Sequence, residues 1–122
     1  MNIEDLQSMT DAYLECALWS SHAYLTGDED AEPVELEGYY PSETFEREAR
    51  QDCRAFIVSN MADLSAMDAE QAGHDFWLTR NGHGAGFWDR GLGKLGERLT
   101  SAAWVYGEVD LYVGDDETVY AG

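Results

Sequence analysis

The sequence predicts an α+β fold, in which two or three helices pack on a small antiparallel sheet formed mostly by the C-terminal half. Apolar residues recur at helical spacing early in the chain, whereas Val109, Leu111 and Val113 alternate with polar residues near its end. The 122 residues are 44% hydrophobic and 12% aromatic, which excludes a disordered acidic tail. We therefore expect a single packed domain over residues 1–122.

Residues 2–26 are predicted to form the first helix, with Asn2 as N-cap and Gly27 as the residue that ends it. The connection that follows, residues 27–41, is acidic and punctuated by Gly and Pro. Val34 and Leu36 alternate with acids there, which indicates a short strand that attaches the connection to the body.

Residues 42–62 are predicted to form a second helix with Ser42 as N-cap. Its core face is expected to consist of Phe45, Ala49, Cys53, Phe56 and Ile57, while Glu43–Arg47 and Glu46–Arg50 form pairs at i,i+4 spacing. The two cysteines, Cys16 and Cys53, lie on apolar faces and are expected to be buried thiols rather than a disulfide.

The composition of the chain becomes rich in aromatic residues and glycine after His74. Asp68 and Gln71 resemble a capping box for a one-turn helix that ends near Gly73. An aromatic run then predicts a strand near residues 75–80, a glycine-rich turn and a second strand near 85–88. Residues 92–106 predict a third helix closed by Gly107, and a final hairpin of residues 109–113 and 118–120 follows.

The most distinctive string is AGHDFWLTRNGHGAGFWDRG, residues 72–91. It resembles a segment of a family of small, largely uncharacterised proteins encoded by bacteriophages and mobile elements. Four further strings resemble the same family: ALWSS at 17–21, DCxxF at 52–56, LTxA at 99–102 and LYVGDD at 111–116. The resemblance covers most of the chain and implies a phage origin without implying an activity. The dense acidic connection departs from it.

Within this string, His74, Asp75 and His83 are the candidates for acid–base chemistry or metal binding. Adjacent residues of a strand point to opposite faces, so the predicted strand would separate His74 from Asp75. The glycines match neither a phosphate-binding loop nor a dinucleotide-binding fingerprint. We expect the aromatic residues of the string to build a core. We expect no catalytic residue, bound metal or cofactor in this protein.

The acidic charge is distributed unevenly. The chain carries 25 Asp and Glu against seven Lys and Arg, and residues 1–46 hold twelve acids with no Lys or Arg. Excess charge of one sign destabilises a compact state, so either the environment or a partner accounts for it. DNA binding through a basic patch is disfavoured, because few cations are available.

The leading hypothesis is a non-enzymatic DNA mimic, whose carboxylates stand in for phosphates on the basic DNA-binding groove of a host defence complex, as in an anti-CRISPR or anti-restriction protein. This step is an analogy with acidic phage proteins. We expect it in the cytoplasm of the infected or lysogenic bacterial host, with no direct contact to nucleic acid or membrane. The expected partner-binding residues are Asp5, Asp11, Glu15, Asp28, Glu29, Asp30, Glu32, Glu35 and Glu37.

Three alternatives remain open. An acidic accessory protein would bind its partner without imitating DNA, through an exposed aromatic such as Tyr39 or Tyr40. A small enzyme or metal protein would centre on His74 and His83. Adaptation to a high-salt host would explain the acidity without any partner.

Overall fold

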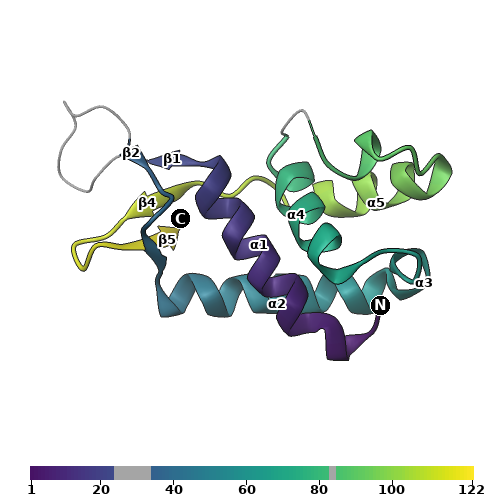
Figure 1. Ribbon diagram of the computed structural model, residues 1–122, viewed down its shortest axis with the longest axis horizontal. Helices are drawn as coiled ribbons and strands as arrows, with labels where there is room; N and C mark the ends of the chain where they lie inside the picture. Colours follow the sequence, from purple (N-terminus) through teal and green to yellow (C-terminus); the bar gives the residue numbers. More distant parts are fainter. Residues whose placement is uncertain (24–33, 83–84) are drawn as a thin grey trace.

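A computed structural model describes residues 1–23, 34–82 and 85–122, and it confirms the α+β class. In Figure 1 the strands gather at the left end, and α4 and α5 lie at the right. The helices, including two short 3-10 turns labelled η, are η1 (Ile3–Asp5), α1 (Leu6–Ser20), α2 (Glu43–Ser59), α3 (Met61–Leu64), α4 (Ala69–Arg80), η2 (Phe87–Asp89) and α5 (Lys94–Trp104).

The described strands form a three-stranded sheet and a separate two-stranded pair. In the sheet, β5 (Thr118–Ala121) lies between β4 (Leu111–Val113) and β3 (Tyr40–Pro41). The predicted hairpin β4–β5 is antiparallel and confirmed, but β3 runs parallel to β5, so the sheet is mixed rather than wholly antiparallel. Parallel strands need a long crossover connection, which the helices α2 to α5 provide here. The separate pair joins β1 (His22–Ala23) to β2 (Val34–Glu35), and it contains the short strand predicted near residue 34.

The first helix is shorter than predicted. Asn2 does cap the chain start, because its side-chain Oδ1 accepts the backbone N–H of Glu4 at 2.8 Å. The helix ends at Ser20, however, and Ser21 is already extended, so the backbone passes directly into the pairing of β1 with β2. The prediction that the helix extends to residue 26 is therefore wrong. The predicted terminating residue, Gly27, lies outside the described residues.

The second helix is confirmed as α2, with the Ser42 hydroxyl accepting the Phe45 backbone N–H at 3.0 Å. All five residues of its predicted core face are buried, and both cysteines are buried and free. Arg50 donates from Nη1 to Oε1 of Gln7 on α1 at 3.0 Å. Among the ion pairs of the described residues, neither predicted Glu–Arg pair of this helix is present.

The region around helix α4 differs most from the sequence-based prediction. The predicted one-turn helix and the predicted strand near 75–80 are one continuous helix, and the second predicted strand near 85–88 is replaced by the turn η2. Gly73 sits where α4 crosses α1. A Cβ on it would lie against the Met9 carbonyl oxygen, and 2.9 Å from both Ala12 Cβ and the Tyr13 backbone nitrogen. Glycine is thus required for this close approach of two helix backbones.

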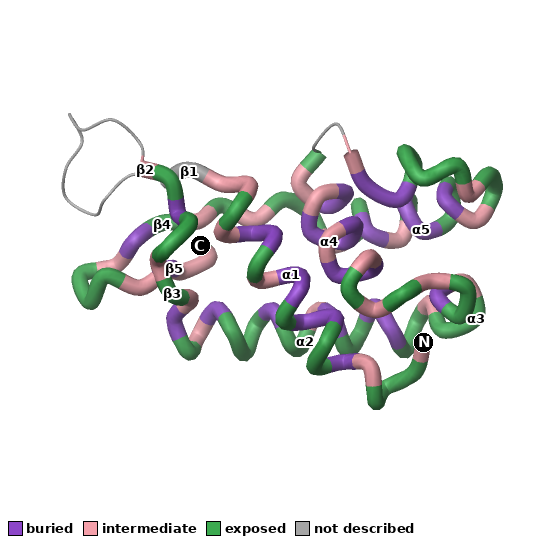
Figure 2. Tube along the Cα trace, in the orientation of Figure 1, coloured by how far each residue is buried: buried purple, intermediate pink, exposed green. Residues whose placement is uncertain are grey.

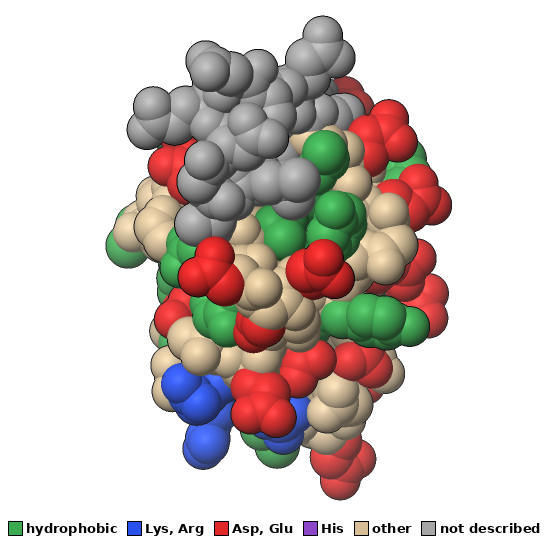
Figure 3. Space-filling view, turned by 90° about the vertical axis from the view of Figure 1, so that its left-hand side faces the viewer, with side chains coloured by type: hydrophobic (Ala, Val, Ile, Leu, Met, Phe, Trp, Pro, Cys, Tyr) green, Lys and Arg blue, Asp and Glu red, His purple; other side chains and the backbone are tan. Residues whose placement is uncertain are grey.

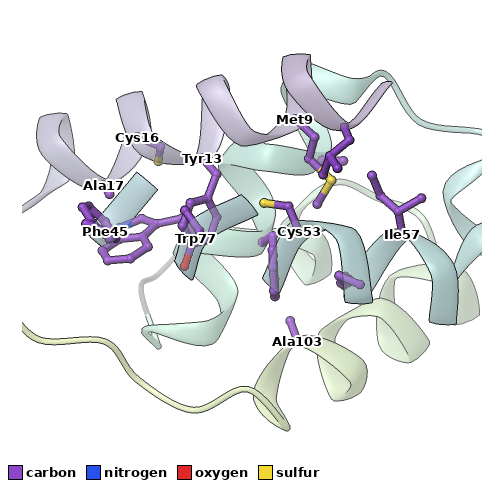
Figure 4. Packing of buried hydrophobic residues seen from close by; sticks show 14 of the residues in the cluster. Met9, Tyr13, Cys16, Ala17, Phe45, Cys53, Ile57, Trp77 and Ala103 are labelled. Atoms are coloured by element: carbon purple, nitrogen blue, oxygen red, sulfur yellow. The ribbon is translucent and has the colours of Figure 1, made fainter. Parts of the chain in front are cut away.

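Helices α1, α2 and α4 each carry buried positions (Figure 2). Aromatic side chains from these helices, among them Tyr13, Phe45 and Trp77, fill the centre of the core (Figure 4). The Tyr13 and Trp77 rings meet edge to face with centroids 5.3 Å apart, and Trp77 also approaches Phe45. The buried indole N–H of Trp77 donates to the Ser20 hydroxyl at 3.1 Å, so the ring is satisfied as well as packed.

A buried arginine joins these helices to the C-terminal segment. The Arg80 guanidinium donates to Tyr13 Oη, to Asp52 Oδ2, and to the backbone carbonyls of Tyr106 and Gly107 at 2.8–3.0 Å. It also lies 5.6 Å from the centroid of the Tyr106 ring. A planar fork with five donors suits this many acceptors, which a lysine could not match.

The buried thiols predict a loss of stability at high pH. Burial raises the pKa of Cys53 to about 12 and that of Cys16 to about 11. Both pKa values in the folded protein exceed the value of about 8.5 for a thiol in the unfolded chain. The stability that the protonated thiols contribute is therefore fully present below about pH 8.5, and it is lost as the pH rises toward the folded pKa values. We expect the free energy of unfolding to fall between about pH 8.5 and 11, and to fall less steeply in Cys53→Ala. Urea unfolding across this range measures both slopes, and equal slopes would contradict the prediction.

Candidate functional site

The structure places the predicted partner-binding acids in several environments. Asp5 is half-buried and accepts the Asn2 backbone N–H at 2.9 Å, so its carboxylate serves the helix start. Asp11 and Glu15 are exposed one turn apart on α1, and Glu35 and Glu37 are exposed on and after β2. The remaining predicted residues, Asp28, Glu29, Asp30 and Glu32, lie outside the described residues.

Asp11 and Glu15 border a groove between α1, β3 and the first turn of α2. Its volume is about 450 Å³, and its lining combines carboxylates with apolar and aromatic side chains. We call it the acidic groove. Its lining residues are Asp11, Leu14, Glu15, Leu18, Gly38, Tyr39, Tyr40, Pro41 and Glu46.

A second hollow of about 380 Å³ adjoins the acidic groove and shares Asp11, Leu14 and Glu46 with it. It adds Glu43 on the acidic side, but also Arg47 and Arg50. The charge along the α1–α2 surface therefore changes from purely acidic beside β3 to mixed farther along α2.

Three of the arginines form ion pairs away from the acidic groove, whereas Arg47 and Arg50 border the adjoining hollow. The three ion pairs found among the described residues join Arg80 to Asp52, Arg90 to Asp75, and Arg98 to Asp63. All three acids come from the chain after residue 46. Within the part of the chain that the structure describes, Asp11 and Glu15 have no ion-pair partner, which leaves the groove rim with a net negative charge. Figure 3 shows carboxylates among exposed hydrophobic side chains at the end carrying β2 and the beginning of α2, with Lys and Arg at its lower edge.

The competing site around the histidines has a different structure from the one predicted. His74 and Asp75 lie on helix α4, not on a strand, and His83 lies outside the described residues. The Asp75 side chain is 0% exposed. Both its oxygens accept from Arg90, with Nη2 2.9 Å from Oδ1, and Gln71 donates to Oδ1 as well. A carboxylate engaged in this way holds the segment after α4 against the helix.

A pocket of about 690 Å³ lies beside this ion pair, between α1 and α4. His74, Arg90, Trp19 and Cys16 are among its lining residues. Burial raises the pKa of the Cys16 thiol to about 11, so it is protonated near neutral pH and a poor nucleophile. Among the described residues, no group of three His, Cys, Asp or Glu side chains could hold a metal ion.

Other polar residues of the distinctive string are also used in packing. The Thr79 hydroxyl accepts the Phe87 backbone N–H at 3.1 Å, and a Cβ on Gly86 would collide with that hydroxyl. Asn81 Oδ1 accepts the Val109 N–H at 2.8 Å. The prediction that the string builds a core is confirmed for Phe76, Trp77 and Phe87, whereas Trp88 is 52% exposed.

Comparison with protein-family models, with curated proteins and with solved structures found no match for this chain. The resemblance to phage proteins therefore stays a prediction. None of the helices in residues 1–23, 34–82 and 85–122 combines the length and apolar character needed to cross a bilayer.

The sequence reading missed Glu46 as a groove residue, together with the apolar floor. The signal was present, because the Ser42 N-cap places Glu43 and Glu46 in the first turn of α2. The apolar floor forms because β3 brings Tyr39 and Tyr40 beside two leucines of α1, Leu14 and Leu18. This neighbourhood depends on tertiary packing, so no pattern in the sequence predicts it.

Proposed function

We propose that this protein is a non-enzymatic acidic inhibitor that binds the DNA-binding surface of another protein in place of DNA. The observation that carries the proposal is the acidic groove, where Asp11, Glu15 and Glu46 converge from two helices with no Lys or Arg among the lining residues. Glu35 on β2 and Glu37 after it are also exposed and add to the acidic surface.

Charge complementarity supports this assignment. Proteins that bind duplex DNA do so largely through Lys and Arg that neutralise phosphates, and such a surface attracts any well-placed array of carboxylates. The net charge of -18 would also steer the approach of a basic partner from a distance.

A narrower form of the proposal concerns the partner. The resemblance to phage and mobile-element proteins supports a host defence complex as the target, hence an anti-CRISPR or anti-restriction role in the cytoplasm of an infected or lysogenic bacterium. The support for this step is analogy with acidic phage proteins, and the groove itself bears only on the charge of the partner.

Reversing the groove acids tests the proposal. The protein is immobilised and exposed to a nuclease-treated bacterial lysate, and bound proteins are eluted with duplex DNA. We expect DNA to release specific proteins from the wild type. The variant Asp11→Lys/Glu15→Lys/Glu46→Lys should bind those proteins more than about a thousandfold more weakly, because each of the three lost charge pairs costs at least ~1.5 kcal/mol.

The matched control reverses three exposed acids that line neither the acidic groove nor the adjoining hollow, Glu70, Glu97 and Glu108. It changes the net charge equally and should retain binding. Circular dichroism melts in a salt series verify that each variant folds, and unfolding of the wild type at low salt would instead favour adaptation to a high-salt host. The proposal fails if duplex DNA releases nothing, or if both triple variants lose binding equally.

A further inference from the structure

The acidic groove contains more than a phosphate mimic requires. Its carboxylates rise beside the half-buried side chains of Leu14, Leu18 and Tyr39, and beside Tyr40, whose side chain is 79% exposed. Pairing of β3 with β5 holds Tyr40 at the edge of the groove. Carboxylates alone would suffice to imitate phosphates, so the apolar and aromatic part of the lining needs an account of its own.

We infer that this groove binds an arginine side chain presented by a basic segment of the partner protein. The inference rests on the proposed function and specifies the contact at its centre. The aliphatic stem of the arginine lies along Leu14 and Leu18, and its guanidinium meets Asp11, Glu15 or Glu46 at the rim. The exposed Tyr40 ring supplies a face on which the guanidinium stacks.

The chemistry of the groove favours arginine over lysine. A guanidinium is planar, weakly hydrated and able to donate two parallel hydrogen bonds to one carboxylate while its face contacts an aromatic ring. An ammonium is strongly hydrated and gains little from the tyrosine ring. The groove therefore discriminates between two cations of equal charge, which a purely electrostatic surface would not do.

Charge also decides against a second copy of this chain as the occupant. Two copies would each carry a charge of -18, and the groove rim would meet a partner of its own sign. A cationic occupant from another protein is the complementary choice.

Two peptides of equal charge, hexa-arginine and hexa-lysine, test the inference without knowledge of the natural partner. Dissociation constants are measured by fluorescence anisotropy at two salt concentrations. We expect the wild type to prefer hexa-arginine by about three- to fivefold, and Tyr40→Ala to bring the ratio of the two constants close to one. Tyr40→Phe keeps the ring and should keep the preference.

Truncation of Trp104, which is 60% exposed on α5, provides the matched control, because Trp104→Ala should leave the preference unchanged. Equal affinity of the wild type for both peptides, or a preference that survives Tyr40→Ala, overturns the inference. Even with those results, the proposed function stands if the triple variant at Asp11, Glu15 and Glu46 binds both peptides more weakly than the control triple variant does. If the groove and control reversals act alike, the proposed function itself fails.

Discussion

Replacing Arg80 with Met should lower the free energy of unfolding by about 3–5 kcal/mol, because three acceptors inside the fold lose their donor at ~1–3 kcal/mol each. Asp52 adds little to this cost, since its side chain is 38% exposed and can be rehydrated. Arg80 is 6% exposed, and its loss leaves the buried Tyr13 hydroxyl and two backbone carbonyls without their donor. Methionine fills much of the same volume, so the deficit arises from unsatisfied polar groups rather than from a cavity. Urea unfolding measures the difference.

The exposed pair of Arg98 with Asp63 offers a control of the same chemical change. Arg98 Nη2 lies 2.9 Å from Asp63 Oδ1, but the Arg98 side chain is 58% exposed. Arg98→Met should therefore leave the unfolding midpoint almost unchanged, since exposed ion pairs contribute little. Equal effects of the two substitutions would show that the hydrogen bonds of Arg80 do not stabilise the fold. Arg80→Lys, which keeps the charge and loses the fork, should fall between them.

Substituting Ala for Gly73 should destabilise the protein by about 3 kcal/mol through overpacking, and lower its melting temperature by roughly 10 °C. The sign is informative, because Gly→Ala inside a helix ordinarily stabilises by up to ~1 kcal/mol. Here the added methyl would meet backbone atoms of Met9 and Tyr13, which cannot move without separating α1 from α4.

Gly91→Ala separates this effect from backbone strain. Gly91 has a φ of 70° and nothing within 4 Å of an added Cβ. Its substitution should therefore cost only the left-handed conformation, about 1–2 kcal/mol. A Gly73→Ala variant as stable as the wild type would mean that the α1–α4 crossing tolerates a wider spacing than the structure shows.

The sequence pattern predicts a helix well where that helix buries only one face. Helix α2 has such a face, and the positions expected to be buried are buried. Helix α4 is buried on several sides, with Ala72, Asp75, Phe76, Trp77 and Thr79 all in the interior, so no apolar stripe marks it as a helix. Its aromatic run favours strand formation by local propensity, and the contact of Gly73 with α1 overrides that propensity.

The candidate site was predictable only in its charge. The absence of Lys and Arg from residues 1–46 indicated which part of the chain to examine, and two acids on α1 follow from helical spacing. The third groove acid, Glu46, and the tyrosines come from elements that only the packing of α1 against α2 and β3 brings together. Asp5 also has a local use at the helix start, where its carboxylate accepts the Asn2 N–H, and its charge alone does not reveal this.

The close crossing at Gly73 also bears on the groove, because α1 contributes to both. One side of this helix is fixed against α4 at Met9, Ala12 and Tyr13, while the other presents Asp11 and Glu15. Asp11 and Glu15 thus stand on a helix whose position is set by its packing against α4, before any encounter with a partner. Pre-organisation of this kind spares a complex the entropy of ordering its binding surface, so affinity can exceed what the small area of the groove would suggest.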